Sequence, residues 1–255
     1  MIFIDTHTHN YDEAFASDAD AVIRNCVDAG VTALIQPDVD SSERDRMFEL
    51  CDRHRGTLYP MLGLYPGSVD KGWREEIDKL EEYAGRGVVA IGEIGLDYHF
   101  STEFVLEQKE AFRVQLEFAS KMNLPVNIHL RDATEDFFRV MDDCKGLGLR
   151  GNLHAFSGSY ETFQRLMKYG DWRIGVGGVV TFRNAALAEV VRKAPLERIV
   201  LETDSPYLTP VPFRGTRNDS TRIPLIAAKV AELKGITIEE VAEATTANAK
   251  SLFRI

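Results

Sequence analysis

The sequence predicts a (β/α)8 barrel, an α/β fold with a metal site at the C-terminal ends of its strands. Eight short apolar runs recur along the 255 residues, with amphipathic stretches between them. Eight strand-then-helix units in about 250 residues are typical of that barrel. In addition, side chains of the metal-ligand type follow one apolar run after another. An open doubly wound sheet is the alternative, but it rarely needs eight units of such even length.

The predicted strands are mostly continuous apolar runs, which is typical of parallel strands covered on both faces. They comprise residues 2–6, 31–36, 58–63, 88–92, 125–129, 150–154, 172–178 and 198–202. Amphipathic stretches at residues 18–29, 73–86, 104–122 and 133–144 predict helices between them. Gly30 and Gly87 stand where the first two of these helices should end.

A long irregular segment, residues 205–219, follows the last predicted strand and contains three prolines. Loops of this length are usually functional or disordered, and this one should lie over the barrel mouth. Two helices, at residues 220–234 and 238–253, then complete the chain, the second with Thr237 and Glu240 as a capping box. We expect residues 1–255 to form a single barrel domain.

The composition describes an ordinary globular protein, with 44% hydrophobic and 27% charged residues and a net charge of −10. This charge argues against a protein that coats nucleic acid, but not against an enzyme with a local basic rim. The three cysteines, Cys26, Cys51 and Cys144, lack paired spacing, which indicates a reduced compartment. Acidic and histidine residues near the N-terminus speak against a signal peptide, and no run reaches the length of a membrane helix. We therefore expect a cytoplasmic protein.

Two histidines, His7 and His9, end the first predicted strand and share one face of it, because side chains repeat every second residue. Further candidate ligands lie at later strand ends: Glu93, His129, His154 and Asp204. In a barrel all of these ends meet at one face. Six such groups exceed the needs of one four-coordinate ion. They suit two divalent ions (Mg²⁺, Mn²⁺ or Zn²⁺) about 3.5–4 Å apart.

Five motifs in this order resemble the TatD family of metal-dependent DNases, which belongs to the amidohydrolase-type superfamily. They are Asp5-Thr6-His7-Thr8-His9, Ile91-Gly92-Glu93-Ile94-Gly95-Leu96-Asp97-Tyr98, Ile128-His129, His154-Ala155-Phe156-Ser157-Gly158 and Glu202-Thr203-Asp204-Ser205-Pro206-Tyr207-Leu208. The resemblance implies a (β/α)8 barrel that hydrolyses phosphodiesters with divalent metals, typically as a 3′-to-5′ exonuclease on DNA. It also implies that Glu93 bridges two ions, one held with His7, His9 and Asp204 and the other with His129 and His154.

The chain departs from the family pattern at three positions. Tyr65 and Gly67 stand where the family commonly has the histidines of Gly-X-His-Pro-His, and Phe213 replaces a histidine before Arg214-Gly215. These positions surround the substrate rather than the metals, so the departures concern which substrate is bound.

Candidate substrate contacts come from arginines and aromatic residues near the predicted ligands. Arg131, Arg214 and Arg217 are candidates for phosphate binding, because a guanidinium matches phosphate geometry. Phe156 and Tyr207 flank ligands and are candidates for stacking on nucleobases.

For the chemistry, Asp204 is the candidate acceptor of the proton of an attacking water, and Glu93 is the second candidate catalytic residue. Asp5 shares the face of His7 and His9 and is a candidate for orienting them, or for a plain role at the strand. Besides a DNase acting on a DNA partner, two other classes stay open. One is a hydrolase of the same fold for a small phosphate, ester or amide, and the other is a non-catalytic metal-bound scaffold.

Overall fold

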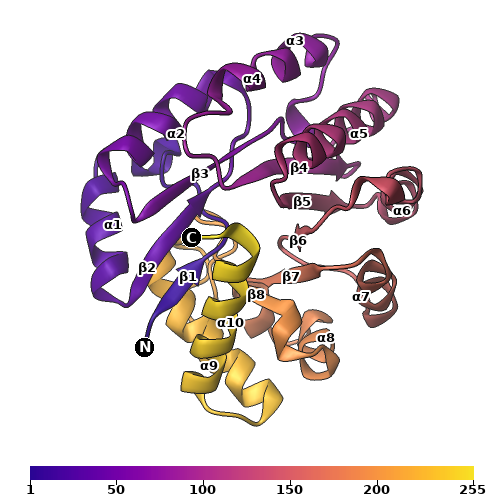
Figure 1. The fold of residues 1–255 in the computed structure, drawn as a ribbon. Helices are drawn as coiled ribbons and strands as arrows, with labels where there is room; N and C mark the ends of the chain where they lie inside the picture. Colours follow the sequence, from indigo (N-terminus) through magenta and orange to yellow (C-terminus); the bar gives the residue numbers. More distant parts are fainter.

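A computed structural model describes all residues, 1–255, and shows eight parallel strands with helices around them (Figure 1). The strands are neighbours in chain order: β1 (Phe3–Asp5), β2 (Val31–Gln36), β3 (Leu58–Leu62), β4 (Ala90–Asp97), β5 (Val126–Arg131), β6 (Gly151–Leu153), β7 (Trp172–Val176) and β8 (Ile199–Leu201). The backbone N–H of Thr6 donates to the Leu201 carbonyl (3.0 Å), and that of Asp204 donates to the His7 carbonyl (2.9 Å). These bonds join the last strand to the first, so the predicted barrel is confirmed and the open sheet is not formed.

Ten α-helices cover the strands: α1 (Ala19–Asp28), α2 (Ser41–Arg53), α3 (Trp73–Asp78), α4 (Leu80–Tyr83), α5 (Val105–Met122), α6 (Thr134–Asp143), α7 (Tyr160–Leu166), α8 (Leu187–Lys193), α9 (Ile223–Lys234) and α10 (Ile238–Phe253). Thr237 and Glu240 form the predicted capping box at α10. Gly30 follows α1 with φ +90°, a conformation that favours glycine. None of the helices is both long and apolar enough to cross a lipid bilayer.

Two predicted elements differ from the structure. Residues 73–86 form two short helices, α3 and α4, rather than one. The second ends at Tyr83, and the chain turns at Ala84 and Gly85. The predicted strand 88–92 extends as β4 to Asp97, because its later half pairs with β5 in the register Asp97 to Arg131. The pairing shifts between Ile91 and Ile94, and Glu93 lies in this irregular stretch.

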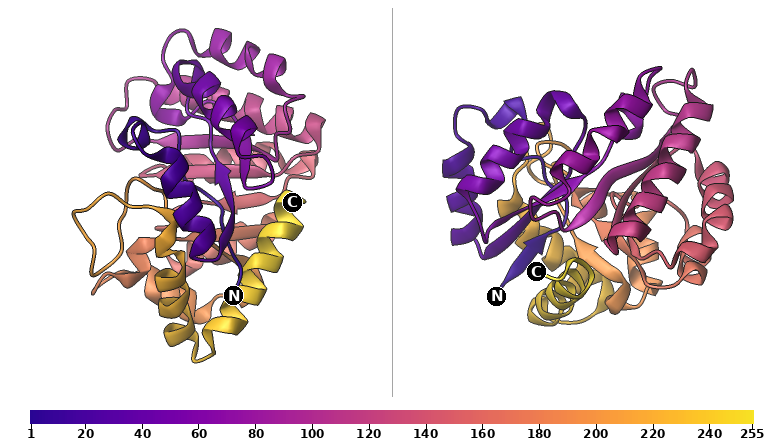
Figure 2. Two further views of the ribbon diagram at one scale, coloured as in Figure 1. Left: turned by 90° about the vertical axis from the view of Figure 1, so that its left-hand side faces the viewer. Right: turned by 45° about the horizontal axis from the view of Figure 1, so that its top comes forward.

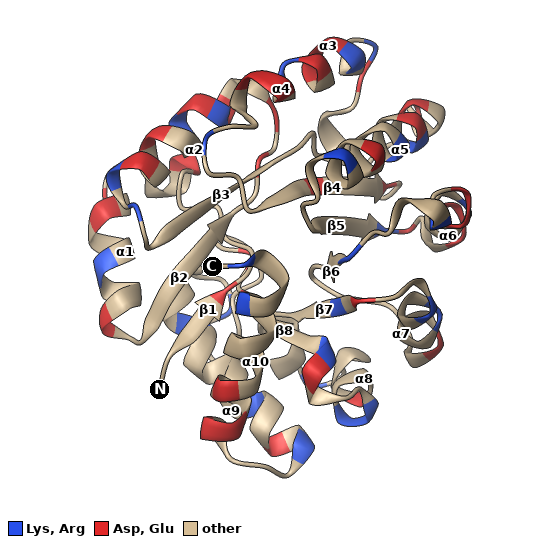
Figure 3. Ribbon diagram, viewed as in Figure 1, with Lys and Arg blue, Asp and Glu red and all other residues tan.

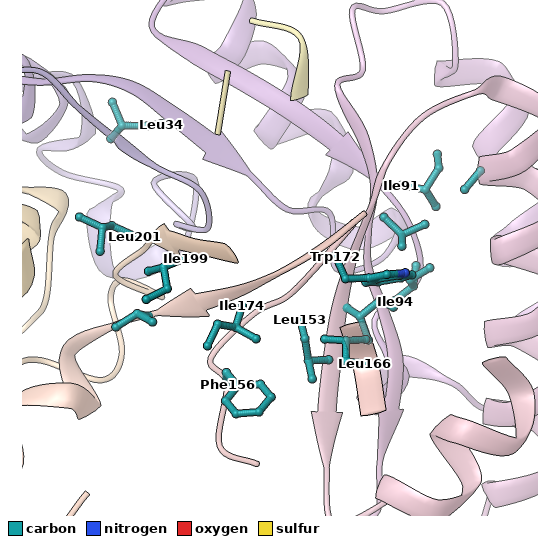
Figure 4. Packing of buried hydrophobic residues seen from close by; sticks show 14 of the residues in the cluster. Leu34, Ile91, Ile94, Leu153, Phe156, Leu166, Trp172, Ile174, Ile199 and Leu201 are labelled. Carbon is teal, nitrogen blue, oxygen red and sulfur yellow. The ribbon is translucent and has the colours of Figure 1, made fainter. Parts of the chain in front are cut away.

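Most of the core lies between strands and helices, in one cluster that includes Ile94 of β4, Leu166 of α7 and Trp172 of β7 (Figure 4). A second, smaller cluster fills the barrel interior at the N-terminal ends of the strands. There Leu252 and Phe253 of α10 pack on inward side chains such as Ile4 and Ile35. The C-terminus accordingly lies near the barrel axis in Figure 1. This end of the barrel is closed, so only the opposite end is open to a ligand.

Residues 205–219 contain no helix or strand and project from the open end of the barrel (Figure 2, left). Most Asp, Glu, Lys and Arg residues lie on the outer helices, with few on the strands (Figure 3). Charged residues on strands are therefore exceptions: Glu93, Asp97 and Arg131 lie toward the open end, whereas Arg173 pairs with Asp171 near the start of β7 (3.1 Å).

Candidate metal centre

The six predicted ligands converge at the open end of the barrel. His7 and His9 follow β1, Glu93 lies in β4, His129 lies in β5, His154 follows β6, and Asp204 follows β8. Five of them, His9, Glu93, His129, His154 and Asp204, line a cleft of about 860 Å³, and His7 is buried beneath it. Parallel strands in a barrel bring their C-terminal ends together, and the structure places all six candidates as that rule predicts.

One cluster of ligand atoms consists of the two N-terminal histidines and two carboxylates. The Nε2 atoms of His7 and His9 are 3.2 Å apart, and each is 3.6 Å from Asp204 Oδ1. Glu93 Oε2 lies 3.4 Å from His7 Nε2 and 4.0 Å from His9 Nε2. Ligands about 2.0–2.2 Å from a tetrahedral ion are separated by about 3.3–3.6 Å. The spacing therefore fits four ligands around one ion.

A second cluster forms around the other oxygen of Glu93. Glu93 Oε1 lies 2.8 Å from His129 Nδ1 and 2.8 Å from His154 Nε2, and these two nitrogens are 3.2 Å apart. The rings of His7 and His154 stack at 3.7 Å and join the two clusters. The two oxygens of one carboxylate thus face two different sets of ligands.

The partners of the outward ring nitrogens set the tautomers of His7 and His9. Asn127 Oδ1 accepts from His7 Nδ1 (2.9 Å), since the Asn127 amide itself donates to Asn152. The Tyr11 hydroxyl donates to the Pro37 carbonyl (2.5 Å), so its oxygen accepts from His9 Nδ1 (3.1 Å). The two Nε2 atoms are therefore left to face each other at 3.2 Å, an arrangement that a proton on one of them or a shared cation satisfies.

At the second cluster, one of the two histidines also makes a hydrogen bond through its outward ring nitrogen. His129 Nε2 donates to Asp97 Oδ2 (2.9 Å), and its Nδ1 then faces Glu93 Oε1. His154 Nδ1 has no hydrogen-bond partner, and its nearest acceptor is Glu202 Oε1 at 3.8 Å. A carboxylate–histidine pair such as Asp97–His129 is the usual support of a metal-binding imidazole, so the donor set fits a divalent metal.

The electrostatics also favour positive charge at this place. Burial lowers the pKa of His7, but the charges of Glu93 and Asp204 more than offset this and raise it to about 10. For His129, burial is likewise outweighed by Asp97 and Glu93, and its pKa rises to about 9. Burial and the neighbouring His7 lower the pKa of His154 to about 4. Without metal, protons on His7 and His129 balance the carboxylates.

Asp5 contacts the backbone of two segments that carry candidate ligands, and it does not contact the ring of a candidate ligand. Its carboxylate accepts from the backbone N–H of His7 (3.1 Å), from the N–H of Thr203 (3.1 Å) and from the hydroxyls of Thr203 and Ser220. Burial raises the pKa of Asp5 to about 6. Asp5 thus fixes β1 against the segment of Asp204, which is the role at the strand, the second of the two that the sequence left open.

Sequence reasoning missed three supporting residues. Asn127 stands two residues before His129 on β5, so alternation along the strand could have identified it. Tyr11 stands two residues after His9 but lies in a turn beyond β1, where strand alternation does not apply. Asp97 shows its role only through the pairing of β4 with β5, which no local pattern reveals.

The structure places some of the predicted substrate contacts in the cleft and others away from it. Arg131 and Tyr207 line the cleft, and Tyr207 is 55% exposed. Phe156 is 2% exposed and packs in the core beside Ile174 (Figure 4), so its prediction as a stacking residue is wrong. The side chain is buried because the chain turns back over β7 after His154.

The two arginines of the late loop do not line the cleft. Arg217 forms an ion pair with Asp18 (2.6 Å) and donates to the Ala14 carbonyl (2.7 Å). Arg214 lies over the ring of Phe182 at 4.3 Å. Both guanidinium groups are used to hold the loop against neighbouring segments.

Of the three departures from the family pattern, only Tyr65 reaches the cleft. Its hydroxyl donates to Asp97 Oδ2 (3.2 Å), and its ring packs edge-on against His129 at 5.1 Å. A Cβ atom on Gly67 would collide with the Tyr65 ring. The two substitutions are therefore linked, since the tyrosine occupies the space that a side chain at position 67 would need.

Comparison with known proteins agrees with this geometry. The family described as "TatD related DNase" matches residues 4–254. The "uncharacterized metal-dependent hydrolase YabD" of Bacillus subtilis is 39% identical over the whole of both chains. The "3′-5′ ssDNA/RNA exonuclease TatD" of Pantoea ananatis is 32% identical over 94% of each chain.

A solved structure is also similar. The crystal structure of YjjV, a TatD homologue from Escherichia coli, superposes with a TM-score of 0.90 at 30% identity and covers 99% of this chain and 98% of its own. The chain therefore belongs to the TatD-related DNase family and is a metal-dependent hydrolase.

Proposed function

We propose that this hydrolase cleaves phosphodiester bonds at the 3′ end of single-stranded DNA, using two divalent ions. The observation that supports two ions is the bridging position of Glu93, whose oxygens face the cluster of His7, His9 and Asp204 and the cluster of His129 and His154. The polarity and the DNA substrate rest on the family and on the relative named as a 3′-5′ exonuclease.

Within this proposal the ions supply charge that neutralises the phosphate oxygens and lowers the pKa of a water molecule. Asp204 accepts the proton of that water. His9 and His7 offset its burial and keep its pKa below the usual value, so the carboxylate is ionised and able to accept a proton. Asp204 also has φ +56°, a strained conformation that places it at the floor of the cleft. Arg131 binds phosphate at the cleft wall.

A second candidate is hydrolysis of a small phosphate, ester or amide. Three carboxylates, of Asp12, Asp40 and Glu43, line the cleft, whereas Arg131 is the only lysine or arginine among the lining residues. Such a lining disfavours a long polyanion on the acidic side and leaves room for a small molecule.

The test compares 5′-labelled and 3′-labelled single-stranded oligonucleotides with a panel of chromogenic esters and phosphates, in Mg²⁺ or Mn²⁺ and in chelator. We expect a ladder of 5′-labelled products shortened from the 3′ end, and none in chelator. Asp204→Asn should reduce kcat by about 10²–10⁴ while the protein still binds metal. Asp28→Asn, on the exposed end of α1, is the control. Rapid turnover of a small ester with intact oligonucleotides would favour the second candidate.

A further inference from the structure

The cleft wall beside His129 carries an exposed aromatic side chain that the family motifs do not include. Phe100 lies in the segment after β4, is 78% exposed and lines the cleft. The guanidinium of Arg131 stands 4.9 Å from the centre of its ring. One face of the ring is thus covered by a cation, and the remaining surface is open to solvent.

The segment that carries Phe100 is held in place although the ring is not buried. The backbone N–H of His99 donates to Asp97 Oδ1 (2.8 Å), and His99 Nδ1 lies 2.9 Å from Asp132 Oδ2. The ring of Phe100 then packs edge-on against His99 at 4.9 Å. These contacts pre-organise an exposed ring, which lowers the entropy lost when a ligand binds it.

The position of Arg131 relates this ring to the candidate metals. Arg131 and His129 are two residues apart on β5, so their side chains share a face, with a separation of about 6.6 Å along the strand. On the other side of the cleft lie the carboxylates of Asp12, Asp40 and Glu43. A phosphate that continues from the metal site is therefore attracted toward Arg131 and repelled from the opposite wall.

We propose that Phe100 and Arg131 bind the nucleotide next to the scissile phosphodiester, with the base stacked on Phe100 and its phosphate on the guanidinium. This inference rests on the proposed nuclease function and adds the way in which the strand enters. Every base has a π-face, so a stacking site accepts all four bases but requires them to be unpaired. The strand enters over Phe100 and ends before the acidic wall, which selects single-stranded ends.

The test is the hydrolysis of a short single-stranded oligonucleotide by Phe100→Ala. Loss of one base–aromatic stack should lower kcat/KM by about 5- to 140-fold. The loss should appear in KM, because the ring does not touch the reacting bond. Leu106→Ala is the matched control, since Leu106 is 69% exposed on the neighbouring helix α5 and does not line the cleft.

A second substrate with an abasic nucleotide next to the scissile bond isolates the stacking contact. The wild type should lose activity on it, whereas Phe100→Ala should treat the normal and abasic strands nearly alike. Binding of an oligonucleotide with 2-aminopurine at this position to Asp204→Asn, read by fluorescence quenching, should weaken when Phe100→Ala is added.

The outcomes separate this inference from the proposed function. If the wild type cleaves no oligonucleotide, the nuclease function itself fails. If the wild type cleaves but Phe100→Ala behaves as Leu106→Ala does, the stacking site is overturned. If the abasic nucleotide lowers kcat/KM equally for the wild type and for Phe100→Ala, the stacking site is overturned as well.

Discussion

Replacing Asp97 by asparagine should weaken the metal cluster around His129 and spare the cluster around His7 and His9. Asp97 touches neither Glu93 nor a metal-facing nitrogen. It accepts from His129 Nε2 through Oδ2 and from the backbone N–H of His99 through Oδ1. The substitution therefore changes the support of one ligand and leaves all six candidate ligands in the chain.

The expected loss of metal affinity follows from the hydrogen bonds that asparagine can still form. Its single oxygen can still accept from His129, but its amide nitrogen then faces the N–H of His99, and the negative charge is lost. A hydrogen bond to a charged group contributes about 1.5–3 kcal/mol and a neutral one about 0.5–1.5 kcal/mol. The difference of about 1–1.5 kcal/mol is about tenfold in metal affinity. Loss of such a partner generally costs about 10–100-fold.

The assay is competition for Zn²⁺ or Mn²⁺ against a chromophoric chelator, which resolves two binding steps. In Asp97→Asn one step should weaken about tenfold and the other should stay within about twofold of the wild type. Asp132→Asn is the control. Asp132 also accepts from a histidine, at 2.9 Å, but His99 is not a candidate ligand and both side chains are exposed.

Two results would refute the reasoning. Equal weakening of both steps would mean that Asp97 acts through the fold rather than through His129. No change in either step would mean that His129 is not a metal ligand, or that its orientation does not depend on Asp97.

Three further predictions concern the same region. Glu93→Ala should be the most damaging ligand change and should lower the metal content measured by mass spectrometry from two ions to one or none, because it removes an oxygen from each cluster. Apparent metal affinity should rise with pH up to about 9–10, since His7 and His129, with their raised pKa values, must each lose a proton to bind metal. Calorimetry at pH 7 in buffers of different ionisation enthalpy should show that about two protons are released when metal binds. Arg217→Ala should lower the melting temperature by about 2 °C through loss of the partly exposed pair with Asp18, with KM for oligonucleotides unchanged.

The barrel and the convergence of its six candidate ligands could be predicted because both depend on local pattern and simple topology. Continuous apolar runs mark buried parallel strands, and the ends of such strands meet at one face whatever the loops do. His7 and His9 are the clearest case, since their spacing fixes their common face. The boundaries of β4 were missed because its later half is defined by pairing with β5 rather than by its own sequence.

The substrate contacts could be predicted only in part, because loop side chains choose among several neighbours. Arg217 has the residue type of a phosphate ligand, but Asp18, about two hundred positions earlier in the chain, forms an ion pair with it. Phe156 stands two residues after the candidate ligand His154 in sequence but packs in the core. Arg131 was predicted correctly as a cleft residue because it continues the alternation of His129 along β5.

The charge of the chain gives the metals a role in binding as well as in chemistry. The net charge is −10, and carboxylates outnumber cations in the cleft lining. Arg131 is the only lysine or arginine that can attract a phosphate there, against Asp12, Asp40 and Glu43. Two divalent ions bound there, as proposed, would outweigh the charges of Glu93 and Asp204 and make the floor of the cleft positive. Chelation should therefore abolish oligonucleotide binding, measured by fluorescence anisotropy, and not only turnover. Undiminished binding in chelator would show that the strand is held by a surface outside this cleft.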